Sequence, residues 1–213
     1  MTSEELFEEM CSVEKSKMGP NTPKDIVNAI LSLVPPDFWK DPNARVLECN
    51  TKSRVFLDAC FERFRANLDV TDDYIWDNML YAGCVNGAVK LVVHYNAPDI
   101  KNVGVWDDYM KLSDVKFDLV VGNPPYAISD GSGHGGGGLE GYSGFVMKAY
   151  ELTKRYVCMI IPARWYSGGR GKGLKAFRRF MLDTLPIAKF HDVLSADVFG
   201  DAAYVAGGML FFS

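Results

Sequence analysis

One stretch limits the folds open to this chain: an apolar run, Leu119 to Val121, that stops abruptly at Gly122-Asn123-Pro124-Pro125-Tyr126. Leu and two Val residues before a glycine are typical of a buried strand in a parallel sheet. Two consecutive prolines remove two backbone N–H donors, so the strand cannot continue past them. Each proline also keeps the residue before it out of the helical region. The pattern predicts a rigid, extended loop at the carboxyl end of a strand, where open α/β sheets bind ligands.

This predicted loop carries groups that suit an amine on a planar ring. Such an amine has two N–H donors, and the Asn123 side-chain oxygen and the Pro124 carbonyl can accept both. The Tyr126 ring can stack on the ring that bears the amine. The alternative is that Asn-Pro-Pro-Tyr is a plain turn, because short motif matches carry false positives. The strand before it favours the functional interpretation.

Asn-Pro-Pro-Tyr after a hydrophobic strand resembles the catalytic motif of the amino methyltransferases. These enzymes use S-adenosylmethionine to methylate adenine N6 in DNA, or amide and amine nitrogens elsewhere. The resemblance implies S-adenosylmethionine as cofactor and DNA as partner, with Asn123 also near the cofactor and Tyr126 also on the substrate base. The catalytic residues that it implies are Asn123, Pro124, Pro125 and Tyr126.

A helix is predicted to begin near Asn21, with Thr22 as its N-cap and Pro23 at its first helical position. An apolar stripe at helical spacing follows, and a pair of prolines ends it. The pattern alone describes an ordinary amphipathic helix. It also resembles the N-terminal cofactor motif of γ-class adenine methyltransferases, which implies that Thr22 and Pro23 help to hold the methionine carboxylate at a helix N-terminus.

The next predicted strand, Arg45 to Glu48, leads into a second resemblance to the same class. Its first cofactor motif has the form acidic-Pro-x-Cys-Gly-Ser-Gly-x-Phe-Leu, and the positions that agree are Glu48, Ser53, Phe56 and Leu57. The resemblance implies that Glu48, Asn50 and Ser53 bind the cofactor. A helix from Val55 to Asn67 is predicted to follow, with its aromatic side chains in the core.

Lys52 and Arg54 depart from that motif, because they occupy its two glycine positions. A restriction-associated branch carries lysine at the first of them. Glycine lets the backbone approach a ligand closely and take unusual φ values. We therefore expect Lys52 and Arg54 to crowd the cofactor and to weaken its binding.

Contacts to the adenosine half of the cofactor have weaker signals. In the family, an Asp before an aromatic residue accepts from the cofactor's adenine amine, and Asp107 or Asp108, ahead of Tyr109, fits. A solvated turn is the alternative. The acidic residue that usually follows the second strand and binds the ribose hydroxyls is missing, and Asn86 is the nearest polar residue.

A basic segment follows another predicted strand, Tyr156 to Pro162. Eight Lys or Arg residues and no acidic residue lie between Lys154 and Arg179. A solvated helix face is one interpretation, and a surface that contacts a nucleic-acid backbone is the other. The residues that we expect to contact phosphates are Arg164, Arg170 and Lys172.

The same region and the tail resemble the Eco57I-like branch of restriction-modification enzymes. Ile-Pro-Ala-Arg-Trp with a glycine-rich turn carries the first part of this resemblance, and Val198-Phe199-Gly200 the second. Gly207-Gly208 before Met209 to Phe212 resembles a closing hairpin with a last antiparallel strand. The resemblance implies that Phe199 contacts the substrate.

The composition of the chain limits which classes of protein it can belong to. A chain of 213 residues with 48% hydrophobic and 23% charged residues suits one globular domain, and its net charge of −4 restricts nucleic-acid binding to a local patch. No apolar run is long enough to span a membrane. Five cysteines without a Cys-x-x-Cys pair, and three histidines, argue against a metal site. The odd cysteine count without a signal peptide indicates a reduced, cytoplasmic protein.

We therefore expect an α/β chain with the Rossmann-like methyltransferase fold: a mostly parallel, doubly wound sheet with an antiparallel last strand. Residues 1–18 would form an N-terminal arm and residues 19–213 the catalytic domain, without a target-recognition domain. The expected function is site-specific methylation of a flipped adenine in DNA within a restriction-modification system. A separate target-recognition or restriction subunit is a further candidate partner.

Two alternatives stay open. One is an RNA or protein-glutamine methyltransferase, which can share Asn-Pro-Pro-Tyr. The other is a degenerate or fragmentary subunit that binds DNA or a partner without catalysis, a hypothesis that Lys52 and Arg54 support.

Overall fold

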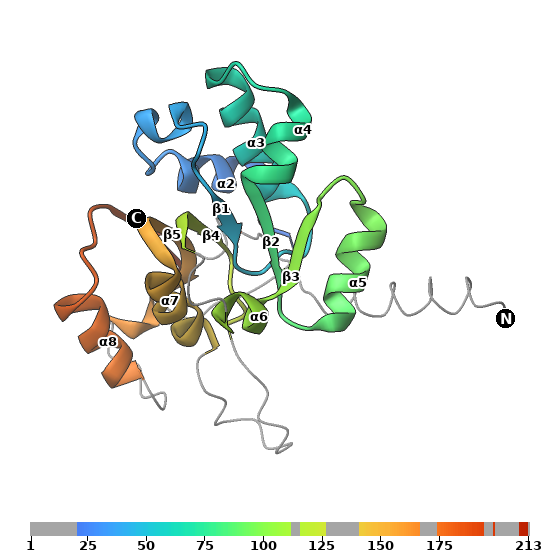
Figure 1. Cartoon of the computed structure of the whole chain (residues 1–213). Helices are drawn as coiled ribbons and strands as arrows, with labels where there is room; N and C mark the ends of the chain where they lie inside the picture. Colours follow the sequence, from blue (N-terminus) through green and yellow to red (C-terminus); the bar gives the residue numbers. More distant parts are fainter. Residues whose placement is uncertain are drawn as a thin grey trace, which may run out of the picture.

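The computed structural model describes residues 21–111, 116–126, 141–166, 174–193, 198 and 209–212. Within them the strands form one sheet of order β3-β2-β1-β4-β5-β7-β6. Strands β1 to β5 pair in parallel, whereas β7 runs antiparallel to both β5 and β6. The strands are β1 Val46–Glu48, β2 Leu80–Cys84, β3 Asn102–Val105, β4 Phe117–Gly122, β5 Thr153–Pro162, β6 Phe190–Val193 and β7 Met209–Phe212. The prediction of a mostly parallel, doubly wound sheet is confirmed (Figure 1).

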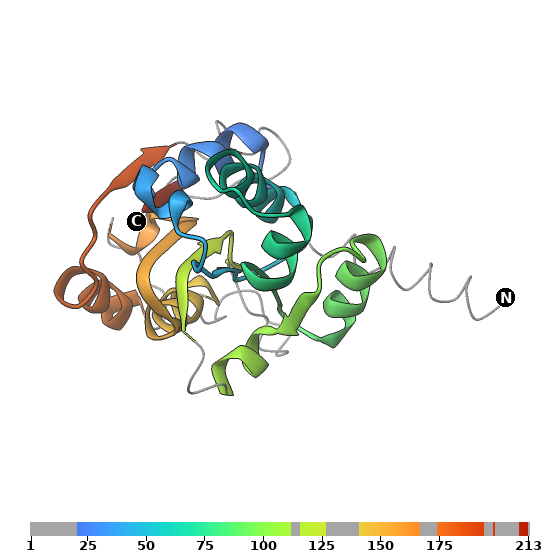
Figure 2. The same ribbon diagram turned by 45° about the horizontal axis from the view of Figure 1, so that its top comes forward.

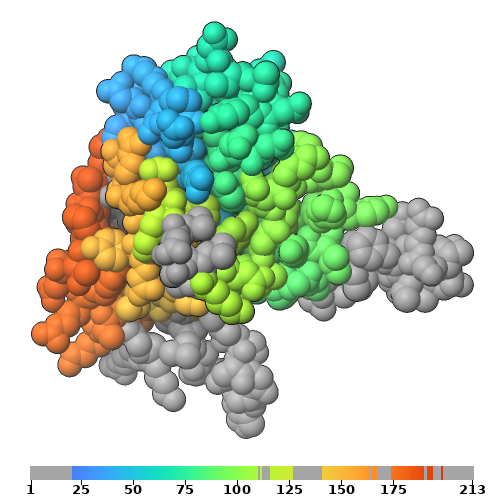
Figure 3. All heavy atoms as spheres, in the orientation of Figure 1, coloured from blue at the N-terminus to red at the C-terminus, as the bar shows by residue number. Residues whose placement is uncertain are grey.

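Helices cover both faces of this sheet. The described helices are α2 Lys24–Leu31, η1 Pro36–Lys40, α3 Val55–Asn67, α4 Asp72–Asn78, α5 Gly87–Asn96, α6 Trp106–Lys111, α7 Gly141–Leu152, η2 Ala163–Trp165 and α8 Leu174–Asp183. Helices α2, α3 and α4 gather on one side, and α7 and α8 lie on the other (Figures 1 and 2). In the space-filling view, α2 and η1 in blue pack beside α3 and α4 in teal (Figure 3).

The alternation of side chains along the central strands explains the two layers. In β4, Leu119 and Val121 belong to the core under α2, α3 and α4. Val120, between them, belongs to the core under α6, α7 and α8. Successive side chains of a strand point to opposite faces, so an uninterrupted apolar run suits a strand buried on both sides. The predicted strand at Leu119 to Val121 is confirmed.

Helix α3 begins and ends where the sequence predicts, and its aromatic residues are buried as expected. Helix α2 differs. Its first helical residue is Lys24, and Pro23 is the N-cap, with ψ of 147° and no side-chain cap. The Pro23 carbonyl accepts the first intrahelical bond, from Val27 N at 3.0 Å. The prediction that Thr22 caps the helix and that Pro23 lies in its first turn is wrong, because the Thr22 hydroxyl is engaged elsewhere.

The fold places a crevice at the carboxyl ends of β1 and β4. These strands are neighbours, yet the chain leaves them toward opposite flanks of the sheet: β2 and β3 lie on one side, and β5 on the other. Such a switch point is where open α/β sheets bind ligands. None of the described helices combines the length and apolar composition that crossing a bilayer requires.

Candidate active site

Three segments meet at this crevice: the residues before α2, the loop after β1 and the loop after β4. Parallel pairing sets Glu48 of β1 beside Val121 of β4, so the two loops begin side by side. Between them lies a small pocket that is open to solvent. Its lining consists of Asn21, Thr22, Glu48, Asn50, Lys52, Ser53, Val55, Phe56 and Asn123. The pocket thus brings together five predicted cofactor-binding residues: Thr22, Glu48, Asn50, Ser53 and Asn123.

Asn123 is the residue that joins the three segments. Its side-chain Nδ2 donates to Thr22 Oγ1 at 3.1 Å, and its backbone oxygen accepts from Asn50 Nδ2 at 2.7 Å. Asn123, Thr22 and Asn50 are all buried. Asn123 Oδ1 is buried without a hydrogen-bond partner. The Thr22 contact therefore fixes the amide so that its oxygen, an acceptor, is left unused.

Gly122 allows the loop to lie this close to β1. Its φ is +146°, a value that L side chains rarely adopt. A Cβ built there would lie 3.0 Å from Cys49 Sγ and 3.4 Å from Cys49 N. Only glycine satisfies both requirements, which explains why the strand ends in Gly-Asn rather than in a further apolar residue.

The two prolines and Tyr126 complete the loop. None of the described peptide bonds is cis, so both prolines are trans. Pro124 is buried, while Pro125 and Tyr126 are half-buried. Burial raises the pKa of the Tyr126 phenol, against a smaller opposing effect of the Asn123 side chain, so the phenol stays protonated at neutral pH. The Tyr126 carbonyl accepts from Gly141 N at 3.2 Å, which ties the loop to the start of α7.

Glu48 is an unusual residue for a strand end in the core. Only 2% of it is exposed, and its Oε2 has no hydrogen-bond partner. Burial raises the pKa of its carboxyl to about 8, against opposing effects of Thr51 and Lys52. In the absence of a ligand, Glu48 is therefore largely protonated at neutral pH.

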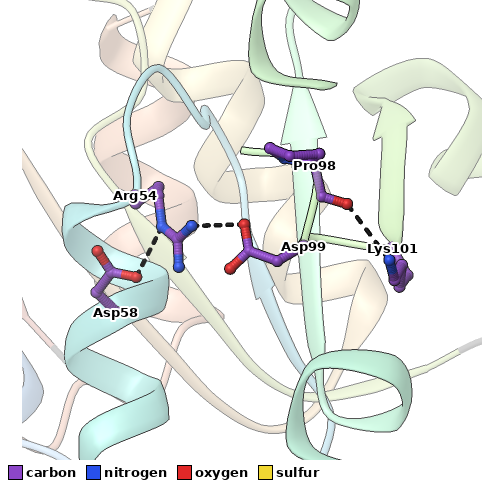
Figure 4. Close-up of polar contacts among 5 residues, drawn as sticks. All are labelled: Arg54, Asp58, Pro98, Asp99 and Lys101. Atoms are coloured by element: carbon purple, nitrogen blue, oxygen red, sulfur yellow. Dashed lines mark hydrogen bonds and ion pairs between the residues drawn. The ribbon is translucent and has the colours of Figure 1, made fainter. Parts of the chain in front are cut away.

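Arg54, at the second glycine position, does not crowd the pocket. Its Nε donates to Asp58 at 3.0 Å and its Nη1 to Asp99 at 2.5 Å (Figure 4). Its guanidinium also lies 5.1 Å from the centre of the Trp76 ring. Its φ is −78°, so the backbone there does not use a glycine conformation. Arg54 is held by Asp58 and Asp99 and does not line this pocket, and its effect on cofactor binding stays a prediction.

Two predicted cofactor residues do not line the pocket. Pro23 lies next to it as the N-cap of α2. Asp107 is in the first turn of α6, with 70% of its side chain exposed and an ion pair to Lys148 at 3.3 Å. Its role toward an adenine amine stays a prediction. Asn86 accepts from Val89 N at 2.9 Å as the N-cap of α5, so its side chain already has a structural task.

The basic segment is not one surface. Arg155 lies at the amino end of β5, away from the candidate site, and pairs with Asp41 at 2.9 Å. Arg178 Nε donates to the Trp165 carbonyl at 2.6 Å. Arg164 lies in η2, directly after the carboxyl end of β5 and so at the same edge as the Asn-Pro-Pro-Tyr loop. The Arg164 side chain, Arg170, Lys172, Phe199 and the predicted arm, residues 1–18, lie outside the described residues.

Some features of the site have no signal in the sequence. Asn21 and Val55 line the pocket, although no motif position singles them out for binding. The orienting bond from Asn123 to Thr22 joins residues 101 positions apart, a separation that no local pattern encodes. The free buried oxygen of Glu48 likewise depends on packing.

In comparisons with known proteins, the matching family and the matching relative are both described as methylases. The family described as Eco57I restriction-modification methylase matches residues 50–199. A Mycoplasma pneumoniae protein, described as an uncharacterized adenine-specific methylase, is 41% identical over 76 residues, which are 34% of this chain and 17% of that protein.

Solved structures share the fold at low identity. The methyltransferase subunit of a type I restriction-modification system from Streptococcus thermophilus aligns with a TM-score of 0.63 at 14% identity, over 91% of this chain and 44% of that one. A Listeria monocytogenes protein assigned to the class I S-adenosylmethionine-dependent methyltransferases aligns with a TM-score of 0.64 at 13% identity, over 97% of this chain and 67% of that one. The chain thus spans less than half of the restriction-modification subunit and about a sixth of the Mycoplasma relative.

Proposed function

This chain belongs to the Eco57I restriction-modification methylase family, and we propose that it is the catalytic part of a DNA adenine N6-methyltransferase. One observation carries the proposal. The Asn123 amide is oriented by Thr22 so that its oxygen is buried and free of a partner, at the rim of a polar pocket. An unpaired buried acceptor is costly, and a ligand donor would satisfy it.

S-adenosylmethionine is the cofactor that we propose for the pocket. When bound, it supplies an electrophilic methyl group on a sulfonium sulfur. Glu48 carries a buried carboxyl oxygen without a partner, which suits the ammonium of the methionine part. Thr22, Asn50 and Ser53 are polar neighbours that fit the same zwitterionic end. Asp107 is the candidate for the adenine amine, although it stands apart from this pocket.

The chain's own residues would act on the amine that is methylated. An adenine amine is a poor nucleophile because its lone pair is delocalised into the ring. The Asn123 oxygen and the Pro124 carbonyl would accept its two hydrogens and so localise that lone pair. Tyr126, and Pro125 beside it, would hold the face of the base. Alignment and polarisation of this kind contribute more to the rate of methyl transfer than a strong base would.

The substrate side rests on the edge of the sheet around this loop. A base within duplex DNA must leave the stack to reach such a loop. Arg164, Arg170 and Lys172 are the candidates for holding the phosphate backbone, and Phe199 for a contact near the base. We propose residues 19–213 as the catalytic domain and residues 1–18 as an arm. Recognition of a specific sequence would then use a further domain or subunit.

The experiment is identification of the methylated product. The protein is incubated with tritiated S-adenosylmethionine and mixed-sequence DNA, alone and with any subunit encoded beside it, and the DNA is digested to nucleosides. We expect the label in N6-methyladenine. Label found instead in RNA or glutamine residues of added substrates would replace DNA as the substrate. Cofactor binding without transfer to any substrate would favour a subunit that has lost catalysis.

A further inference from the structure

Lys52 is a partly buried cation, and it has no ion-pair partner among the described residues. It lines the same pocket as Glu48 and Ser53. Across the part of the chain that the structure describes, it makes no ion pair or hydrogen bond. An ammonium group that is withdrawn from water without a partner is unfavourable. Burial accordingly lowers the pKa of Lys52, against the attraction of Glu48. The positive charge of Lys52 therefore favours binding of an anionic group in this pocket.

Glu48 does not supply the negatively charged partner that Lys52 lacks. No ion pair joins the two side chains within the described residues, although both line the pocket. Because burial raises the pKa of Glu48 to about 8, most of its carboxyl groups are neutral at pH 7 in the absence of a ligand. Thus Lys52 offers a positive charge, while the free Oε2 of Glu48 offers a place for a hydrogen-bond donor.

The start of α2 adds to the positive potential of the pocket. Asn21 and Thr22 line the pocket immediately before this eight-residue helix. No side chain caps the helix, since the Thr22 hydroxyl accepts from Asn123 instead. The first N–H groups of a helix lack intrahelical acceptors and favour an anion. The buried, unpartnered carboxyl oxygen of Glu48 is the independent sign that this pocket takes a ligand.

We propose that Lys52 binds the carboxylate of the cofactor's methionine part, while Glu48 accepts from its ammonium. Lys52 would then hold the cofactor through its charge. The motif's glycine at this position would instead let the backbone approach the cofactor closely. This inference rests on the proposed use of S-adenosylmethionine. It also reverses the expectation from the sequence, in which lysine at this position only takes up space.

Isothermal titration calorimetry with two ligands tests the proposal. One ligand is S-adenosylhomocysteine, and the other is an analogue that lacks only the carboxylate. We expect Lys52→Met and Lys52→Gln to weaken S-adenosylhomocysteine binding by about tenfold or more, because a hydrogen bond to a charged group is removed. Binding of the decarboxylated analogue should change by less than about twofold. Lys52→Arg should keep most of the affinity.

Lys24→Met is the matched control, because Lys24 is an exposed lysine in the first turn of α2 that does not line the pocket. It should change neither dissociation constant. If Lys52→Met binds S-adenosylhomocysteine as tightly as the wild type or more tightly, Lys52 is an obstacle and the inference is overturned, while the proposed function stands. If the folded wild type binds neither ligand, both fall together. Thermal melting confirms that each variant is folded.

Discussion

At the residue scale, the site depends on a few polar side chains that satisfy one another only in part. Asn123 uses its amide nitrogen and its backbone oxygen, and keeps Oδ1 free. Glu48 keeps Oε2 free. The types of these residues could be predicted from the sequence, because each stands at a motif position. Their connections could not, since they join residues 73 and 101 positions apart.

Thr22 provides a test of how the Asn123 amide is oriented. Thr22→Val keeps the shape of the side chain and removes the hydroxyl that accepts from Asn123 Nδ2. The amide can then rotate, so we expect kcat for methyl transfer to fall by about tenfold or more. Thr22→Ser should restore most of it. An equal loss in both variants would mean that the hydroxyl is not what matters, and unchanged kcat in Thr22→Val would exclude an orienting role.

Glu48 makes stability depend on pH in a defined direction. Its pKa is about 8 in the folded chain, against an ordinary value of 4.5. The folded state therefore keeps a proton that the unfolded state releases, so this contribution to the unfolding free energy is complete below about pH 4.5 and is lost as the pH rises toward 8. Glu48→Gln lacks this titration.

Urea unfolding of both proteins between about pH 5 and about pH 8 measures the effect. We expect the free energy of unfolding of the wild type, minus that of Glu48→Gln, to decrease steadily as the pH rises across this range. A difference that stays constant would show that Glu48 is ionised over the whole range, contrary to its buried environment.

At the scale of elements, the sequence predicts type better than boundaries. Helix α3 has the predicted bounds because its apolar spacing continues from end to end. Helix α2 begins one residue later than expected, because Thr22 is drawn to Asn123 and Pro23 takes the cap position. The direction in which the Arg54 side chain points could not be predicted either, because its partners Asp99 and Trp76 belong to other parts of the fold.

Arg54 should therefore matter for the attachment of α3 and not for the cofactor. Its ion pairs to Asp58 and Asp99 are partly exposed, with about a third of the Arg54 side chain accessible. Such pairs contribute little, so Arg54→Gln should lower the free energy of unfolding by about 1 kcal/mol or less. We expect the dissociation constant of S-adenosylhomocysteine to stay within about twofold of the wild type. A marked gain in affinity would revive the crowding hypothesis for this position.

At the scale of the whole molecule, the mostly parallel, doubly wound sheet could be predicted from patterns that the sequence displays: apolar strands, a proline-terminated loop and helices between them. The sequence did not predict that the basic residues between Lys154 and Arg179 lie at two opposite edges of the sheet. Strand β5 is long enough to carry Arg155 to the amino edge of the sheet while Arg164 stands at the carboxyl edge. Contact with DNA should therefore come from the part of the segment after β5.

The combined change of Arg164, Arg170 and Lys172 to Ala tests this surface. We expect weaker DNA binding and a flatter dependence of log K on log salt, by up to about 0.9 for each phosphate that is no longer neutralised. The matched control changes Lys154 and Arg155, which precede the buried part of β5 at the opposite edge. Equal salt slopes for the wild type and the triple variant would return these residues to an ordinary solvated surface.

The catalytic role of Asn123 is decided by the rate of tritiated methyl transfer to mixed-sequence DNA by wild type, Asn123→Ala and Asn43→Ala, with any neighbouring subunit present. Asn43 is an exposed asparagine far from the loop in sequence, and its variant serves as control. We predict that Asn123→Ala loses about 10²–10³ in rate, as expected for a group aimed at developing charge. Its melting temperature should stay close to that of the wild type, and any loss of affinity for S-adenosylhomocysteine should be much smaller than the loss in rate. If the wild type is active and Asn123→Ala retains that activity, the loop is structural only and the proposed chemistry is wrong.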